Sequence, residues 1–299
     1  MRTTSQTAST TPAYDARATP PPVRFRHLLA GVRGAASDEG LLRVVARVAQ
    51  RHGAEVTAAT VFRPRVLAPQ RWSTQRHRIE SDERRDAAAW LRGVRAQLHR
   101  LKPVEDRWTL YRAVGDPGTE LARAAARHDA DLTVIGIGRE TAPEREFGSH
   151  VAMRLAQLAG APLLAVARAC PPAWHKAVVL LDGRRHDTAV LRAVAALLEP
   201  PARVIVIAPP AVADAPVRAE SEQLGLRVRY EHTPSARDAE MAALAAADRT
   251  HADVLALPLY GDSPAVRALT NYRAVRVLGT ANCSVLLVPD TGWSPDLLG

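Results

Sequence analysis

Short apolar runs alternate with longer amphipathic segments along most of the chain. In the first half these runs predict a buried strand at 27–32 and further strands at 54–62, 108–114, 131–138 and 161–167. The apolar spacing of 38–53 (DEGLLRVVARVAQRHG) predicts a helix that begins at Ser37 or Asp38 and stops at Gly53. Further helices are predicted at about 81–101, from Asp116–Pro117 to His128, and at about 149–159. This alternation indicates βαβ units, which form an α/β fold with a parallel sheet covered by helices on both faces.

The same pattern recurs in the second half. Strands predicted at 176–183, 202–208, 226–232, 251–258 and 283–289 correspond in order to those of the first half. Asp131 corresponds to Asp253 and Val166 to Val288, an offset of 122 residues in both cases. We infer an internal duplication. It predicts one domain over 23–168 and a second over 175–290, preceded by a disordered tail over 1–22 that is rich in Ser, Thr, Ala and Pro.

The composition of the chain argues against several classes of protein. The 299 residues suffice for two domains, and no apolar run approaches the ~18 residues of a membrane helix. Cys170 and Cys283 are too few for a disulfide framework or a Cys-rich zinc site, and residues 1–22 contain no apolar signal region. We therefore expect a cytoplasmic protein without a metal site.

The net charge of +9 is unevenly distributed. Residues 171–299 contain 13 Lys and Arg against 14 Asp and Glu, so the whole excess lies in the first 170 residues. Arg-rich solvated helix faces explain it more simply than a polyanion-binding patch. Aromatic residues make up only 4%, which argues against nucleic-acid binding by base stacking.

The segment GDPGTELARAAARHDADLTVIG (115–136), the glycine-bearing loop after it and the duplication together resemble the universal stress protein family in its tandem form. The resemblance implies two tandem, doubly wound five-stranded parallel sheets that pack as a pseudo-dimer through their last strands. It also implies a non-catalytic stress-response regulator. In some members ATP binds at the carboxyl ends of strands one and four, which is where ligands bind in open α/β sheets.

The family's ATP-binding pattern is Gly, two residues, Gly, nine residues, Gly, then Ser or Thr. Gly138 is followed by nine residues and then by Gly148–Ser149, which matches the second spacing. The first spacing does not match, because one residue separates Gly136 from Gly138. Glycines allow a phosphate to approach the backbone, and Ser149 is also a good N-cap for the helix predicted to begin there.

Three further residues complete the predicted nucleotide site. Val61, at the end of strand two, is placed against the base, and Arg139 lies in the glycine loop. Arg33 stands where the family has an aspartate that contacts ligand hydroxyls or a metal, although a guanidinium can pair directly with phosphate. No catalytic residue is identified.

The second half departs from the pattern differently. Asp182 stands at the acidic position, but Pro258 replaces the first glycine, Gly261 remains, and Thr270–Asn271 replace the closing Gly–Ser. We expect this half not to bind ATP and to act as a structural partner of the first.

Two alternatives stay open. In the first alternative, both nucleotide sites are inactive and the chain binds an unknown protein partner through its surface, for example through the basic face of residues 63–102. Alternatively, the chain is an ATP-using enzyme, for which the segment 31–38 (GVRGAASD) lacks the expected Ser- and Gly-rich loop. Dimerisation of the whole chain is also open.

Overall fold

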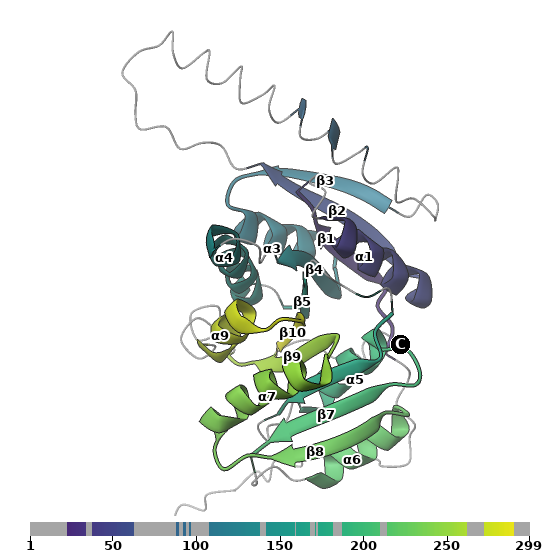
Figure 1. The fold of residues 1–299 in the computed structure, drawn as a ribbon. Helices are drawn as coiled ribbons and strands as arrows, with labels where there is room; N and C mark the ends of the chain where they lie inside the picture. Colours follow the sequence, from purple (N-terminus) through teal and green to yellow (C-terminus); the bar gives the residue numbers. More distant parts are fainter. Residues whose placement is uncertain are drawn as a thin grey trace, which may run out of the picture.

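The computed structural model describes residues 23–33, 38–62, 108–137, 142–158, 160–167, 173–181, 187–209, 214–261 and 272–289, together with Pro171 and a few positions between 88 and 96. Strands and helices alternate through these ranges and build one long twisted sheet with helices on both sides (Figure 1).

The first half contributes five parallel strands in the spatial order β3-β2-β1-β4-β5. They are β1 (His27–Gly31), β2 (Glu55–Phe62), β3 (Trp108–Val114), β4 (Leu132–Ile137) and β5 (Leu163–Ala167). The helices described between them are α1 (Asp38–His52), α3 (Pro117–Arg127) and α4 (Ala142–Leu158). The chain moves outward from β1 to β3 and then crosses back to β4. The connections therefore diverge between β1 and β4.

The second half repeats this order as β8-β7-β6-β9-β10. Its strands are β6 (Lys176–Leu180), β7 (Arg203–Ala208), β8 (Arg227–His232), β9 (Val254–Leu259) and β10 (Ser284–Pro289). Its described helices are α5 (Asp187–Leu197), α6 (Asp214–Gln223), α7 (Ala236–Thr250) and α9 (Tyr272–Thr280).

The two halves join edge to edge. β5 and β10 pair antiparallel, with Leu164 opposite Leu286 and Leu163 opposite Leu287, so the two five-stranded layers form one ten-stranded sheet. The prediction that the last strands pair within the chain is confirmed. Pairing removes two apolar edges that would otherwise be open to other chains, and covalent linkage favours the internal partner.

Each face of the sheet carries its own hydrophobic core. Leu28 and Ala30 of β1 contribute to the core beneath α1 and α5, whereas Leu29 between them contributes to the core beneath α3, α4, α7 and α9. This follows from the alternation of side chains along a strand. β5 and β10 are buried at every position, as central strands covered on both faces require.

Equivalent aspartates anchor the start of β1 and of β6. The Asp131 carboxylate accepts the N–H groups of Arg26 and His27 at 2.6 and 3.3 Å. Asp253, 122 residues later, accepts those of His175 and Lys176 at 2.7 and 2.9 Å. Burial raises the pKa of Asp131, while these N–H donors oppose the rise.

The turns before these two aspartates also match. Asp129 and His251 both adopt left-handed backbone conformations, with φ of 47° and 50°. Positive φ is uncommon outside glycine. Its occurrence at equivalent positions supports the duplication inferred from the sequence.

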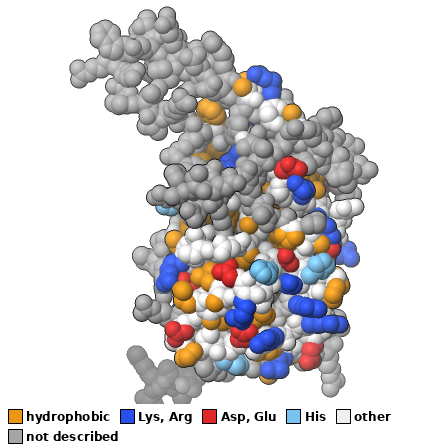
Figure 2. Space-filling view, viewed as in Figure 1, with side chains coloured by type: hydrophobic (Ala, Val, Ile, Leu, Met, Phe, Trp, Pro, Cys, Tyr) orange, Lys and Arg blue, Asp and Glu red, His pale blue; other side chains and the backbone are white. Residues whose placement is uncertain are grey.

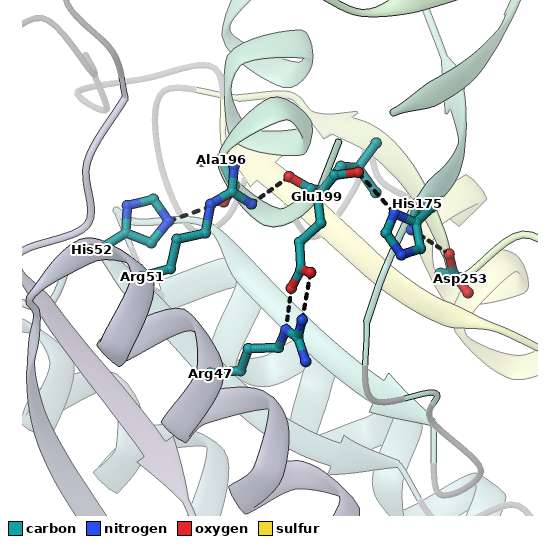
Figure 3. Close-up of polar contacts among 8 residues, drawn as sticks. Arg47, Arg51, His52, His175, Ala196, Glu199 and Asp253 are labelled. Atoms are coloured by element: carbon teal, nitrogen blue, oxygen red, sulfur yellow. Dashed lines mark hydrogen bonds and ion pairs between the residues drawn. The ribbon is translucent and has the colours of Figure 1, made fainter. Parts of the chain in front are cut away.

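A polar cluster joins the end of α1 to the end of α5 across the two halves (Figure 3). Arg47 makes a two-pronged ion pair with Glu199, and Arg51 donates to the Leu198 carbonyl. His52 Nε2 donates to the Ala196 carbonyl at 2.9 Å. The last carbonyls of a helix lack partners within it, so first-half side chains complete the hydrogen bonding at the end of α5.

Most predicted elements lie where the pattern placed them. α1 ends before Gly53, whose φ is 66°, and α3 begins at Pro117 after the N-cap Asp116, as predicted. The tail 1–22, most of the helix predicted at 81–101 and the basic face 63–102 lie outside the described residues. Among the helices the structure describes, none is long and apolar enough to cross a membrane.

Candidate functional site

The carboxyl ends of β1, β2 and β4 meet at one edge of the first half. Gly31 is the register partner of Ala59 on β2 and of Ile135 on β4. The predicted residues Arg33, Val61 and Gly136 lie just beyond this row, so the structure brings them to the same edge. Since the connections diverge between β1 and β4, this is the position where an open α/β sheet offers a ligand crevice.

Arg33 is held at this edge by Asp38, the first residue of α1. The Asp38 Oδ2 accepts the backbone N–H of Arg33 at 2.6 Å, and its Oδ1 lies 3.7 Å from the Arg33 Nε. Asp38 is buried, whereas 47% of the Arg33 side chain remains exposed. The carboxylate occupies the N-terminal end of α1, where it interacts favourably with the helix dipole. The start of α1 is thus occupied by a carboxylate, with the partly exposed Arg33 guanidinium beside it.

Val61 lies near the end of β2 and is partly buried against the core beneath α3 and α4. Its neighbour Thr60 is buried and donates from Oγ1 to the Val32 carbonyl at 3.0 Å. Val32 in turn donates its N–H to the Ala59 carbonyl at 2.9 Å. These bonds fix the segment after β1 against β2, and with it the position of Arg33.

Gly136 is the penultimate residue of β4 and faces open space. A Cβ built on it would meet no atom within 4 Å. By contrast, a Cβ on Gly31 would lie 3.0 Å from Ile135 Cγ2 and 3.1 Å from Leu121 Cδ1. Packing therefore favours glycine at 31 and does not account for the glycine at 136.

The predicted start of the next helix is wrong. α4 begins at Ala142 and not at Ser149, so Gly148 and Ser149 lie within the helix. Pro143 near its start and Glu144 and Glu146 in its first turns favour a helix from this point. Only the first four N–H groups of a helix lack internal acceptors, so those of Gly148 and Ser149 are used inside α4. Gly138 and Arg139 lie outside the described residues.

Comparison with known proteins identifies the family of the first half. Residues 24–167 match the model of the Universal stress protein family. The first half of the chain belongs to the universal stress protein family. The match covers the half that contains Arg33, Val61 and Gly136, and the second half repeats the strand order of this half.

Solved structures share the whole two-part fold. A universal stress protein from Archaeoglobus fulgidus DSM 4304 aligns over 88% of this chain and 96% of its own, with 13% identity and a TM-score of 0.60. A functionally unknown protein from Pseudomonas aeruginosa PAO1 aligns over 89% and 92%, with 15% identity and a TM-score of 0.54. At these identities the likeness shows the fold alone. No curated protein matches the chain.

The second half differs from the first at the equivalent edge of its sheet. Pro258 occupies the place of Gly136 and lies within β9, opposite Val288. Pairing between β6 and β9 ends at Val179 and Ala256, two residues before this proline. Gly261 follows β9 with a φ of 120°. Asp182 and residues 262–271 lie outside the described residues.

Sequence reasoning missed two residues that shape the first-half edge. The sequence pattern marks Asp38 only as a helix N-cap, whereas its carboxylate accepts the Arg33 N–H. Thr60 gave no signal beyond its place in an apolar strand, although its buried hydroxyl fixes the segment after β1. A carboxylate five residues after an arginine, at the start of a helix, is the pattern that could have indicated the first of these contacts.

Proposed function

We propose that the chain is a non-catalytic, cytoplasmic stress-response protein whose first half binds an adenine nucleotide, with ATP as the expected ligand. The observation that carries the proposal is the family match over residues 24–167, the half with open space beside Gly136 at the β1–β4 edge. We assign the two units to 23–168 and 175–290, the second as structural partner.

The residues at the edge have distinct roles in this proposal. Gly136 and Gly138 let the phosphates approach the backbone, Arg33 and Arg139 supply positive charge, and Val61 contacts the base. Gly136 fits a phosphate because no side chain fills the space beside it. Gly148 and Ser149 join the site only if the first two turns of α4 unwind on binding, since their N–H groups are otherwise used within the helix.

A second candidate function has support from specific observations. The contact between Asp38 and Arg33 and the helical state of Gly148 both favour a protein that binds no nucleotide and acts through its surface. An unknown protein would then be its partner, and nucleotide would have no effect on that interaction.

Isothermal titration of the full chain with ATP and magnesium separates these candidates. Gly136→Val places a side chain in the open space, and a valine is well tolerated in a strand. We expect this variant to bind ATP at least about tenfold more weakly than the natural chain, because backbone approach is blocked.

Gly160→Val is the matched control. Gly160 is exposed between α4 and β5, and a Cβ there also meets no atom within 4 Å. It should bind like the natural chain. No heat from the natural chain, or equal losses in both variants, would favour the surface-acting candidate.

A further inference from the structure

Three cations stand side by side at the edge of the sheet where β6, β7 and β8 begin. Lys176 is the register partner of Arg203, and Arg203 is that of Arg227. Residues that share a register position on parallel strands point to the same face, and neighbouring strands lie about 4.8 Å apart. All three side chains are exposed. They form a row of positive charge about 10 Å long, which we call the basic row.

The cations of the basic row have few partners. The side chains of Arg203 and Arg227 make no ion pair with any residue that the structure describes. The Lys176 ammonium donates only to the Thr250 carbonyl, at 3.3 Å. At the same edge, the Asp253 carboxylate accepts the backbone N–H of Lys176.

Two further arginines extend the positive surface. Arg229 and Arg249 are both exposed, and both contact Glu231, at 3.4 and 3.0 Å. That one carboxylate is shared between two guanidinium groups, so it does not offset the basic row. Figure 2 shows several Lys and Arg side chains on the lower part of the molecule, with Asp and Glu side chains among them.

The first half differs from this row at the two equivalent positions that the structure describes. There the corresponding positions on β1 and β2 are His27 and Glu55, which are register partners. The basic row also does not reflect overall charge, because residues 171–299 contain slightly more acidic than basic residues. Positive charge is thus concentrated locally in the less basic half of the chain.

We propose that the basic row binds an inorganic oligophosphate. Guanidinium groups bind phosphate oxygens in pairs, and an ammonium adds a point charge. The row is too short for a nucleic-acid duplex, whose binding proteins contact about six to ten phosphates. Single strands require aromatic stacking, but Tyr230 of β8 packs against the core on the opposite face. A short chain of phosphates matches both the length and the chemistry.

The test is isothermal titration of the full chain with sodium tripolyphosphate at low salt. Arg203→Gln combined with Arg227→Gln should weaken binding by at least about tenfold, the effect of losing one charge-assisted hydrogen bond. The matched control combines Arg112→Gln and Arg123→Gln, which remove the same charge from exposed positions in the first half. It should keep binding within about twofold, because those sites lie outside the row.

Tripolyphosphate resembles the phosphates of ATP, so the Gly136→Val background removes the contribution of the proposed nucleotide site. In that background Arg203→Gln combined with Arg227→Gln should still weaken tripolyphosphate binding by at least about tenfold. The proposal is overturned if the natural chain does not bind tripolyphosphate, or if the control loses as much as the double variant. It is also overturned if a 20-base-pair duplex binds through Arg203 and Arg227 while tripolyphosphate does not.

Discussion

The two halves of the chain keep the same sheet but differ at its carboxyl edge. Asp131 and Asp253 make equivalent hydrogen bonds at the start of β1 and β6. At the carboxyl edge, by contrast, Gly136 of β4 corresponds to Pro258 of β9. Positions that hold buried strands are constrained by packing in both copies, whereas an edge is constrained only by what it binds. The comparison therefore indicates that the halves share a fold and differ at the edge where an open α/β sheet offers a ligand crevice.

The seam between the halves should produce the largest effects. Leu164 of β5 and Leu286 of β10 are register partners and fully buried. Leu164→Ala and Leu286→Ala should each lower the free energy of unfolding by about 2–5 kcal/mol, through lost burial and a cavity. Urea denaturation should show one shared transition for each variant.

Val114→Ala is the control for the seam, since Val114 is 67% exposed, and it should change stability by less than about 0.5 kcal/mol. Two separate transitions in the seam variants would mean that the halves fold independently and that the ten-stranded sheet is not one cooperative unit.

The second largest effect is expected at the equivalent aspartates of the two halves, Asp131 and Asp253. Asp131→Ala and Asp253→Ala each leave backbone N–H groups of the following strand without their acceptor. We expect losses of about 2–3 kcal/mol in thermal or urea unfolding, similar for the two variants. Glu39→Ala, at an exposed position, should be nearly neutral. A large difference between the two variants would show that Asp131 and Asp253 share their hydrogen-bond geometry but contribute unequally to stability.

His52 gives a pH-dependent contrast. Its Nε2 donates to Ala196 of the second half, and its Nδ1 accepts the Phe25 N–H at 3.4 Å, so the neutral ring satisfies both neighbours. Burial lowers the pKa of His52, and the nearby Arg51 and Arg24 lower it further. The unfolded chain then binds the proton more readily, so stability should fall as pH decreases below about 6.5.

His52→Gln keeps a donor and an acceptor but does not titrate. At pH 8 it should cost about 1 kcal/mol, and its stability should fall less than that of the natural chain between pH 7 and 5. Burial also lowers the pKa of His27, so His27 contributes to the same pH dependence. The pH slope of His27→Gln is therefore measured alongside that of His52→Gln, which separates the contributions of the two histidines. Identical pH slopes for His52→Gln and the natural chain would remove His52 from this role.

The ion pair between Arg47 and Glu199 should matter least. It links α1 to Glu199, two residues after the end of α5, but 44% of the Arg47 side chain is exposed. A double-mutant cycle with Arg47→Ala and Glu199→Ala should give a coupling free energy of no more than about 1 kcal/mol, reduced further by salt. A coupling above about 2 kcal/mol would show that this pair, and not the β5–β10 seam, holds the halves together.

The sequence predicted the central strands well because their apolar runs are buried on both faces. It also predicted the start of α3, where Asp116 and Pro117 give an unambiguous signal. It misplaced the start of α4, where two signals compete: Gly148–Ser149 fits the family pattern, and Pro143 marks an earlier start. Contacts such as that of Asp131 with His27 could not be predicted, because they join residues 104 positions apart.

The most direct test of the functional contrast is the number of ATP molecules bound per chain, measured by equilibrium dialysis with labelled ATP and magnesium at saturation. One per chain, reduced by Gly136→Val but not by Gly160→Val, is the predicted result. Two per chain would contradict the loss of the site in the second half, and none would contradict nucleotide binding by the first.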